Sequence, residues 1–374
     1  MIGTEFIPVN QLSLDGNEKA YLNQCIDTGW ISSEGPFVRR FEEQFAAQVG
    51  RQYGVAVSNG SVALDAAVVA LGMGKDDEVI MPTFTIISCA AAVVRAGATP
   101  VLVDSDPFTW NMNVDAVKKR ITNRTKAIMV VHIFGLPVDM DPILALAAQN
   151  GIQIIEDAAE MHGQKYKGRP CGSFGNISTF SFYPNKHVTT GEGGMIVTDS
   201  AELAEKCRSL RNLCFQPRKR FIHEDLGWNF RMSNLQAALG VAQLERLNVF
   251  VERKRQMGRQ YTELLSDVAA LQLPIPSTEY AQNIYWVYGL LLKDEVCFDA
   301  EESMRRLKEL RIETRPFFWP MHEQPVFRKM GLFDGESYPM AERMARRGFY
   351  LPSGLGLTSH QISYVAECVR SVFS

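Results

Sequence analysis

Between Glu18 and Phe182 the chain alternates between short apolar runs and stretches in which apolar residues have helical spacing. This alternation limits the fold more than any other feature, because strands that alternate with helices build a mostly parallel sheet with helices on both faces. The apolar runs that we interpret as strands are Tyr53–Val57, Glu78–Met81, Thr99–Val103, Lys126–Val131, Ile152–Ile155 and Ile177–Phe182. The stretches with helical spacing are Glu18–Thr28, Pro36–Val49, Ser61–Leu71, Ile86–Ala96 and Asp141–Gln149.

The pattern changes after about Gly240. Gln243–Leu265 is a long charged stretch in which an apolar residue recurs about every three or four positions, as in an amphipathic helix. A chain of 374 residues is longer than one hydrophobic core usually serves. We therefore predict a large α/β domain at residues 1–245 and a smaller α+β domain at residues 246–374, connected by this helix.

Composition argues against several classes of protein. Hydrophobic residues make up 46% and charged residues 22% of the chain, and the net charge is −3, which is ordinary for a soluble enzyme. This balance gives no support for a nucleic-acid or membrane partner, and no apolar stretch is long enough to span a bilayer. The seven cysteines are dispersed without C-x-x-C or zinc-ligand spacing, so we expect reduced thiols, a cytoplasmic location and no bound metal.

The stretch Ser181–Met195 follows the last predicted strand and reads S-F-Y-P-N-K-H-V-T-T-G-E-G-G-M. Lys186 lies in this turn, which is rich in Thr and Gly. From there its side chain can reach the open end of a parallel sheet, where α/β folds bind ligands. The alternative is a surface lysine beside a glycine-rich turn, and the local sequence leaves that alternative open.

Asp157 follows the apolar pair Ile154–Ile155, which places it at the carboxyl end of a predicted strand. A carboxylate in this place can pair with the protonated ring nitrogen of pyridoxal phosphate (PLP). At a separation of about 4 Å and an effective dielectric constant near 20, such a pair is worth about 4 kcal/mol before desolvation. The alternative is an aspartate that caps a helix.

Two loops that precede helices are further candidates. Val57–Leu64 reads V-S-N-G-S-V-A-L, in which a strand passes through small residues into a helix whose first amides lack internal partners. Such amides form a seat for phosphate, although an ordinary capped helix start has the same sequence pattern. Gly227–Asn234 reads G-W-N-F-R-M-S-N and mixes polar and aromatic residues; its alternative is a loop in which Ser233 or Asn234 caps a helix.

In this order, the motifs resemble one family. Over essentially its whole length, from I-P-V-N to R-P-F-F-W-P-M-H, the chain resembles the DegT/DnrJ/EryC1/StrS family of PLP-dependent sugar aminotransferases. The most specific blocks are F-S-F-Y-P-N-K-H-V-T-T-G-E-G-G-M and G-W-N-F-R-M-S-N-L-Q-A-A-L-G. W-I-S-S, V-S-N-G, I-T-N-R-T-K-A-I-M and E-T-R-P are shared with the branch that aminates GDP-4-keto-6-deoxymannose to give GDP-perosamine.

The resemblance implies a fold of the aspartate-aminotransferase type (PLP fold type I) and assigns roles to several residues. Lys186 forms the internal aldimine with PLP, Asp157 pairs with the pyridine nitrogen, and Glu160 lies near the ring hydroxyl. The reaction expected from the family is the transfer of an amino group from L-glutamate to a nucleotide-linked 4-keto-6-deoxy sugar. Lys186 then moves a proton between the donor's α-carbon and the cofactor.

The resemblance also implies a phosphate site and a shared active site. The amides of Gly60 and Ser61 and the hydroxyl of Ser181 hold the phosphate. Asn229 reaches the phosphate from the partner subunit, which makes the protein an obligate homodimer. Weaker candidates for contacts with the sugar or the amino donor are Arg231 and His322. Arg315 is a further candidate for this role, and the alternative is that it simply pairs with an acid.

The chain departs from the family pattern in two places. Ile86 follows P-T-F-T where family members often have an aromatic residue, so it offers an apolar lid over the cofactor but no ring stacking. Tyr183-Pro184 stands where Phe-Gly is expected. Two other functions remain as alternatives: a PLP-dependent sugar dehydratase, in which histidine replaces the lysine, and a non-catalytic PLP-binding regulator. The presence of Lys186 argues against both.

Overall fold

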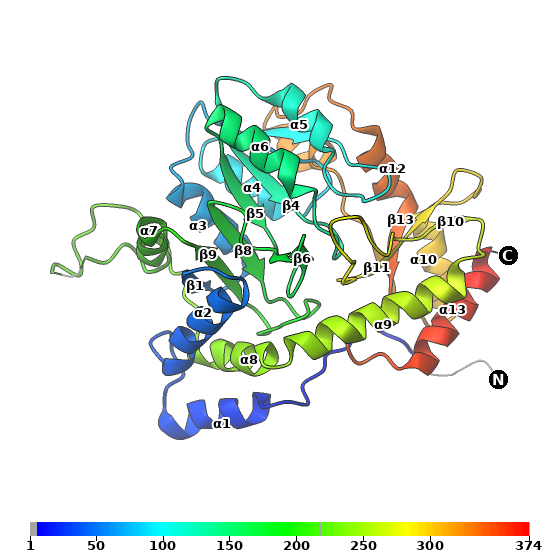
Figure 1. Ribbon diagram of the computed structural model, residues 1–374, viewed down its shortest axis with the longest axis horizontal. Coiled ribbons are helices and arrows are strands. Elements are labelled where there is room, and N and C mark those ends of the chain that lie inside the picture. The colour runs from blue at the N-terminus through cyan, green and yellow to red at the C-terminus, as the bar shows by residue number, and fades with distance from the viewer. Residues whose placement is uncertain (1–5, 217, 374) are drawn as a thin grey trace.

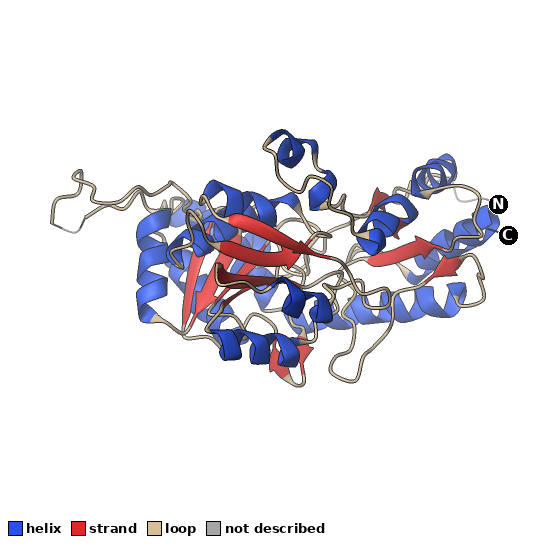
Figure 2. Ribbon diagram, turned by 90° about the horizontal axis from the view of Figure 1, so that it is seen from above, coloured by secondary structure: helices blue, strands red, loops and turns tan. Residues whose placement is uncertain are grey.

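The computed structural model describes residues 6–216 and 218–373. Figure 1 shows a large sheet flanked by helices, a smaller sheet at the C-terminal end of the chain, and a long helix that runs from one towards the other. Figure 2, seen from above, shows the same two groups of strands side by side. No helix among the described residues is long and apolar enough to cross a membrane.

The large sheet has seven strands in the order β1-β9-β8-β5-β4-β2-β3. Its pairings are parallel except that β9 runs antiparallel to both β1 and β8. The mostly parallel α/β fold predicted from the alternating pattern is therefore confirmed. The strands are β1 (Tyr53–Val57), β2 (Glu78–Pro82), β3 (Thr99–Val103), β4 (Thr125–Val131), β5 (Gln153–Asp157), β8 (Ile177–Ser181) and β9 (Gly194–Thr198).

Helices cover both faces of this sheet because its strands are apolar on both sides. On β1, Val55 and Val57 face one hydrophobic cluster, whereas Ala56 between them faces the other. The first cluster includes residues of α3, α4 and α7, and the second includes residues of α2, α6 and α8. The helices are α1 (Glu18–Thr28), α2 (Pro36–Gln48), α3 (Gly60–Ala70), α4 (Ile87–Arg95), α5 (Val114–Arg120), α6 (Met140–Asn150), α7 (Ala201–Arg211) and α8 (Asn234–Leu244).

The C-terminal part is built on a four-stranded antiparallel sheet in the order β10-β11-β13-β12. The strands are β10 (Leu271–Gln272), β11 (Tyr288–Leu292), β12 (Arg315–Pro316) and β13 (Gly348–Leu351). Its helices are α9 (Leu247–Leu265), α10 (Ala300–Glu309), the 3-10 turn η1 (Met321–Glu323), α11 (Pro325–Lys329), α12 (Pro339–Arg347) and α13 (Ser359–Phe373). A short hairpin of β6 (Lys165–Tyr166) and β7 (Arg169–Pro170) completes the strands.

Two features differ from the sequence prediction. The stretch Gln243–Leu265 is not one helix: α8 ends at Leu244 and α9 begins at Leu247. The residues at this break are held by the N-terminal segment, since Glu245 accepts hydrogen bonds from Asn17 and Tyr21, and Arg246 pairs with Asp15. The predicted domain boundary at residue 245 falls at the same break.

The second difference concerns the N-terminal segment, which the prediction assigned to the large domain. Ile7 is buried in the C-terminal hydrophobic cluster and forms a parallel bridge with Ile312. Further along, the amide of Ser353 donates to the carbonyl oxygen of Val9. The first described residues therefore pack on the C-terminal sheet, because the apolar side chain of Ile7 is buried there.

Between α7 and α8 the chain forms a projecting arm, residues 212–216 and 218–229 (Figures 1 and 2). Its base is closed by a bridge between Asn212 and Asn229. The arm exposes large apolar side chains, with 91% of Leu226 and 79% of Phe221 accessible to solvent. Exposed apolar side chains gathered on one projection are typical of a surface that binds another protein.

Candidate active site

A cavity of about 740 Å³ lies where the carboxyl ends of β4, β5 and β8 meet the first turn of α3 and the C-terminal sheet. Ligands of α/β folds bind at this end of the strands. The large sheet and its helices contribute Gly60, Ser61, Ile86, Asp157, Glu160, Thr179, Ser181 and Lys186 to the lining, and the C-terminal part contributes Trp286, Arg315, Phe318 and Tyr350.

Lys186 lies in a tight turn after β8, where its amide donates to the carbonyl oxygen of Tyr183 at 2.9 Å. Its side chain is only 10% exposed, and its Nζ lies 3.8 Å from Oε1 of Glu160. The same nitrogen lies 3.7 Å from the centre of the Trp286 ring. Burial lowers the pKa of Lys186, while the carboxylates of Glu160 and Asp157 oppose that shift. The predicted lysine is therefore a buried amine inside the cavity, not a surface side chain.

Asp157 is the last residue of β5 and is buried. Its Oδ1 accepts the amide of Ala159 at 3.0 Å, and its Oδ2 accepts the thiol of Cys89 at 3.2 Å. Burial raises the pKa of Asp157. A buried carboxylate with so few donors is available to a cationic partner in the cavity, and the helix-cap alternative is wrong because no helix begins there.

Glu160 follows in the loop after β5 and is also buried. Its Oε2 accepts the amide of Phe134 at 2.6 Å. Burial raises the pKa of Glu160 to about 8, and the nearby charge of Lys186 opposes this rise. The pair of Glu160 and Lys186 thus shares a site in which burial disfavours the charge on each side chain.

The first turn of α3 forms an anion seat at the edge of the cavity. Asn59 caps this helix, since its Oδ1 accepts the amide of Val62 at 3.0 Å. The amides of Gly60 and Ser61 have no intrahelical acceptor, and a helix N-terminus favours negative charge. A β-carbon at Gly60 would lie 2.6 Å from the β-carbon of Ser181, so only glycine allows this close approach. The motif is therefore a capped helix start, and its N-terminus opens on the cavity, where it favours an anion.

A buried hydrogen-bonded pair, His132 and Glu156, supports the ends of β4 and β5. Nε2 of His132 lies 3.2 Å from Oε1 of Glu156, and Nδ1 of His132 accepts the amide of Val138 at 3.0 Å. Glu156 also accepts backbone amides of the loop after β7 and the hydroxyl of Ser178. Burial alone would raise the pKa of Glu156, but His132 and these amides lower it to about 2. Cys171 lies close to this pair, but both nitrogens of His132 are already engaged, so the trio does not offer a free set of metal ligands.

Of the weaker predicted residues, two line the cavity. Ile86 precedes α4, is 45% exposed and forms part of the cavity wall. Arg315 on β12 also lines the cavity and pairs with Glu313 at 2.6 Å. Both are therefore available to a ligand.

Three other predicted residues, Asn229, Arg231 and His322, lie outside the cavity of their own chain. Asn229 is exposed at the base of the arm, where its Oδ1 accepts Nε of Arg231 at 2.8 Å. Ser233 caps α8 through a capping box with Gln236, as the alternative interpretation of this motif expected. His322 is buried with Nδ1 2.9 Å from the hydroxyl of Thr83, which places it away from the cavity lining.

The sequence did not identify Trp286, Phe318, Tyr350 or Cys89 as site residues. The first three belong to the C-terminal part. Phe318 lies within the quoted block R-P-F-F-W-P-M-H, but no role was assigned to it, and Trp286 and Tyr350 lie outside the quoted blocks. The sequence carried only a weak signal for Cys89, namely its position four residues after Thr85 of the P-T-F-T motif. In the structure, its sulfur lies 3.3 Å from the hydroxyl of Thr85. Thr179 on β8 also lines the cavity, and its buried Oγ1 has no hydrogen-bond partner in the described part of the chain.

A mostly parallel sheet that delivers a buried lysine, a strand-end aspartate and a helix N-terminus to one cavity defines a PLP-dependent enzyme of fold type I. The chain belongs to the DegT/DnrJ/EryC1/StrS aminotransferase family, whose model matches residues 12–370. It is therefore an aminotransferase. The family and the fold predicted from the sequence motifs are both confirmed.

Individual relatives agree with this assignment. The chain is 41% identical to the GDP-perosamine synthase of Escherichia coli O157:H7, over 99% of both chains. It is 38% identical to the GDP-perosamine synthase of Vibrio cholerae, over 98% of this chain and 99% of the relative. Among solved structures, the aminotransferase TlmJ from Streptoalloteichus hindustanus superposes with a TM-score of 0.91 at 31% identity, over 98% of both chains.

The residues present fit PLP, the cofactor of this family. Because Gly60 has no β-carbon, the first turn of α3 can lie close to Ser181, so that both line the place where a phosphate would bind. Lys186 and Asp157 supply the amine and the carboxylate that PLP enzymes use. The partnerless hydroxyl of Thr179 faces the same cavity and is available to a polar group of the cofactor. The donor set therefore matches a phosphorylated, cationic heterocycle.

Proposed function

We propose that this protein transfers the amino group of L-glutamate to C4 of GDP-4-keto-6-deoxymannose, giving GDP-perosamine and 2-oxoglutarate. The observation that carries this proposal is the 41% identity, over 99% of both chains, to an enzyme named GDP-perosamine synthase. The unpaired state of all seven cysteines further supports a cytoplasmic location for the enzyme.

In this proposal the cavity holds the cofactor at three points. The amides of Gly60 and Ser61 and the hydroxyl of Ser181 bind its phosphate at the start of α3. The carboxylate of Asp157 binds its ring nitrogen, and Glu160 faces its ring hydroxyl. When bound, PLP supplies an electron sink that stabilises negative charge on the substrate carbon that loses a proton.

Lys186 is the residue that moves the proton. Because burial lowers its pKa, its amine is more readily neutral near physiological pH than an exposed lysine, as a general base must be. In the half-reaction with glutamate, Nζ of Lys186 would take the proton from the α-carbon of the donor. In the half-reaction with the keto-sugar, the same amine would act in the opposite direction and give a proton to C4 of the sugar. Ile86 covers the site as an apolar lid that excludes water.

The weaker candidates receive different roles. Arg315 lines the cavity next to Tyr350 and presents a cation to the carboxylate of the amino donor or to the diphosphate. His322 bridges Thr83 and Glu342, so we propose that it supports the wall of the site without touching substrate. This replaces the contact with substrate or amino donor that the sequence resemblance implied for His322.

The enzyme acts as a homodimer in this proposal, with each site completed by the partner subunit. Asn229 is exposed at the base of the arm and lies outside the cavity of its own chain. Arg231 holds Asn229 through a hydrogen bond of 2.8 Å, which gives it a positioning role in place of the expected substrate contact. The exposed side chains of Phe221 and Leu226 on the arm supply the apolar surface that an interface needs.

The substrate is tested by an amino-transfer assay with PLP, L-glutamate and a panel of GDP-, dTDP- and UDP-linked 4-keto-6-deoxy sugars. We expect the highest kcat/KM with GDP-4-keto-6-deoxymannose and an amino group at C4 of the product. Lys186→Ala serves as the blank for uncatalysed amination. A clearly higher kcat/KM with a dTDP- or UDP-linked sugar would contradict the substrate assignment but leave the aminotransferase class intact.

The shared site is tested by co-refolding Lys186→Ala with Asn229→Asp. The Asn229→Asp change keeps the oxygen that accepts from Arg231 but places a carboxylate against the phosphate, so each variant alone is expected to be inactive. Random mixing makes about half of the dimers mixed, and one of their two sites carries neither change, so roughly a quarter of the wild-type activity returns. If mass spectrometry shows mixed dimers but no activity returns, Asn229 does not act across the interface.

A further inference from the structure

Lys254 is a buried lysine on α9 that none of the family motifs includes. Only 2% of it is exposed. Its Nζ donates to the carbonyl oxygen of Trp286 at 2.8 Å and to that of Ser353. Among the described residues it forms no ion pair with a carboxylate, and the charge that acts on it is the like charge of Lys186. Burial lowers the pKa of Lys254 to about 7, so a charge on its amine is costly, and the two carbonyl oxygens are the groups that hold the amine in place.

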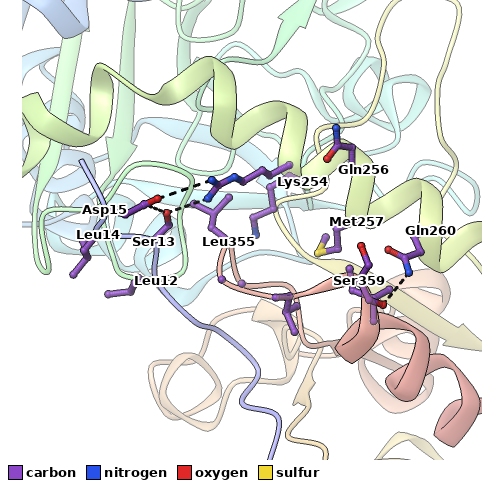
Figure 3. A pocket seen from close by; sticks show the side chains of 15 residues that line it. Leu12, Ser13, Leu14, Asp15, Lys254, Gln256, Met257, Gln260, Leu355 and Ser359 are labelled. Atoms are coloured by element: carbon purple, nitrogen blue, oxygen red, sulfur yellow. Dashed lines mark hydrogen bonds and ion pairs between the residues drawn. The ribbon is translucent and has the colours of Figure 1, made fainter. Parts of the chain in front are cut away.

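Figure 3 shows Lys254 in the lining of a pocket, together with Met257 of α9 and Leu355 of the loop after β13. Lys254 also lines a smaller cavity of about 260 Å³ that shares Trp286 and Arg315 with the cofactor cavity. The residue therefore lies in the wall between the α9 surface and the active site.

The two carbonyl oxygens belong to segments that meet under the active site. Trp286 lies just before β11 and Ser353 just after β13, and the hydroxyl of Ser353 also accepts the amide of Tyr288 at 2.9 Å. The Nε1 of Trp286 donates to the carbonyl oxygen of Asn185, the residue before Lys186, at 2.8 Å. Trp286 is thus fixed at its backbone by Lys254 and at its ring by the turn that carries the catalytic lysine.

The face of the Trp286 ring lies under Nζ of Lys186, at 3.7 Å from its centre. An indole face attracts an ammonium group more strongly than a neutral amine. The proposed role of Lys186 makes it alternate between these two forms. The position of the ring therefore affects both where the amine lies and how readily it takes up the proton.

We propose that Lys254 is a positioning residue of this aminotransferase, which holds the backbone of Trp286 so that the indole face lies under the amine of Lys186. This inference rests on the proposed role of Lys186 as the proton carrier. In addition to the indole face, several ionisable groups interact with Lys186 through their charge. They are Cys89, Asp157, Glu160, His162, His187 and Lys254 itself. Lys254 acts through hydrogen bonds to Trp286, not as one more charge in this set.

The first test is spectroscopic and uses the apoenzyme. The chain has five tryptophans, so labelling with 5-fluorotryptophan gives five ¹⁹F resonances, and the Trp286→Phe variant assigns one of them. We expect Lys254→Met to shift and broaden the Trp286 resonance and to leave the other four in place. The matched control is Arg253→Met on the same helix, because Arg253 binds Ser13 and does not contact Trp286.

The second test is a double-mutant cycle on the rate of the half-reaction with L-glutamate, measured in a single turnover. Lys254→Met is expected to slow this step by about tenfold to a hundredfold, as a misplaced catalytic group does, with cofactor affinity within about twofold of wild type. In the Trp286→Leu background the same change is expected to have little further effect, because the two residues act as a unit. Equal effects of Lys254→Met in both backgrounds would mean that Lys254 acts as a charge.

An unmoved Trp286 resonance in Lys254→Met would overturn the proposal, as would additive effects in the cycle. If Lys254→Met does not fold, Lys254→Gln is measured in the same way, since its amide is one atom shorter and the same direction of change is expected. Both tests omit the sugar, so an error in the proposed sugar substrate leaves their outcome unchanged. If the wild-type protein does not react with glutamate, but Lys254→Met still shifts the Trp286 resonance as expected, the result would contradict the proposed function and not the role of Lys254.

Discussion

Replacement of Asp157 by asparagine separates the chemistry of the cavity from the stability of the fold. The asparagine Oδ1 can keep the hydrogen bond from the amide of Ala159, now 3.0 Å long. Its Nδ2 then faces the sulfur of Cys89, whose thiol can turn towards the hydroxyl of Thr85 at 3.3 Å. Each group that contacts Asp157 therefore keeps a partner in Asp157→Asn, and we expect the variant to fold.

The magnitude of the effect follows from the lost charge. A carboxylate and a protonated ring nitrogen about 4 Å apart attract each other by about 4 kcal/mol at an effective dielectric constant near 20. Since each 1.4 kcal/mol is a factor of ten, we expect the half-reaction with L-glutamate to slow by about a hundredfold to a thousandfold. Stability should change in the opposite direction: burial raises the pKa of Asp157, so its charge destabilises the folded apoenzyme above the carboxyl's unfolded pKa.

The assay is a stopped-flow measurement of the glutamate half-reaction, combined with the thermal midpoint of the apoenzyme. We expect the rate to fall while the midpoint stays the same or rises. Asp65→Asn is the matched control, because Asp65 lies on α3, pairs with Arg95 and does not line the cofactor cavity. A near wild-type rate in Asp157→Asn, or a lowered midpoint together with the slower rate, would refute this reasoning and make Asp157 a structural residue.

Three further predictions follow from the site. Lys186→Ala should abolish turnover with both substrates while PLP still binds, which absorbance spectra and equilibrium dialysis can check; activity without added amines would contradict the role of the lysine. Gly60→Ala should weaken cofactor affinity by about tenfold or more, because its β-carbon would lie 2.6 Å from that of Ser181, and dialysis of PLP measures this directly. His162→Gln should flatten the pH dependence of apoenzyme stability in acid. Burial lowers the pKa of His162 to about 3, so between pH 3 and its ordinary value of 6.5 the unfolded chain binds a proton that the folded chain does not. Stability therefore falls as the pH falls through this window, by about 1.4 kcal/mol per pH unit for this one group, and denaturant titrations at several pH values should show the slope reduced in the variant.

The parts of the site that the sequence predicted share a structural reason. Lys186, Asp157 and the first turn of α3 all lie next to the carboxyl end of a buried strand, and such strands stand out as apolar runs. A parallel sheet brings these ends together at one edge, so local patterns were enough to place them in one cavity. In the structure, all three line the same cavity.

The parts that the sequence missed depend on long-range packing. Trp286 and Tyr350 reach the cavity from residues 100 and 164 positions after Lys186, and nothing in their local sequence marks that destination. The break between α8 and α9 depends on ion pairs and hydrogen bonds with the N-terminal segment, which helical periodicity does not contain. The exposed apolar residues of the arm resemble core residues when only the sequence is considered.

The contact between the two parts of the chain can itself be tested at Gly135. This residue has φ +99°, and its carbonyl oxygen accepts the amide of Ile284 at 3.1 Å. A β-carbon there would lie 2.6 Å from the backbone nitrogens of both Tyr285 and Trp286. Gly135→Ala should therefore push the segment that carries Trp286 away from the large sheet.

We expect this displacement to lower both stability and activity, because the ring under the amine of Lys186 moves with its backbone. The matched control is Gly151→Ala, which also has a positive φ, +63°, but whose β-carbon would meet no atom within 4 Å. Strain of the left-handed backbone alone costs about 1–2 kcal/mol and should appear in both variants. The close approach adds about 1–3 kcal/mol more in Gly135→Ala, together with a slower glutamate half-reaction that the control does not show. Equal losses of stability and equal rates in the two variants would mean that the large sheet does not set the position of Trp286, and that the C-terminal part builds its side of the cavity independently.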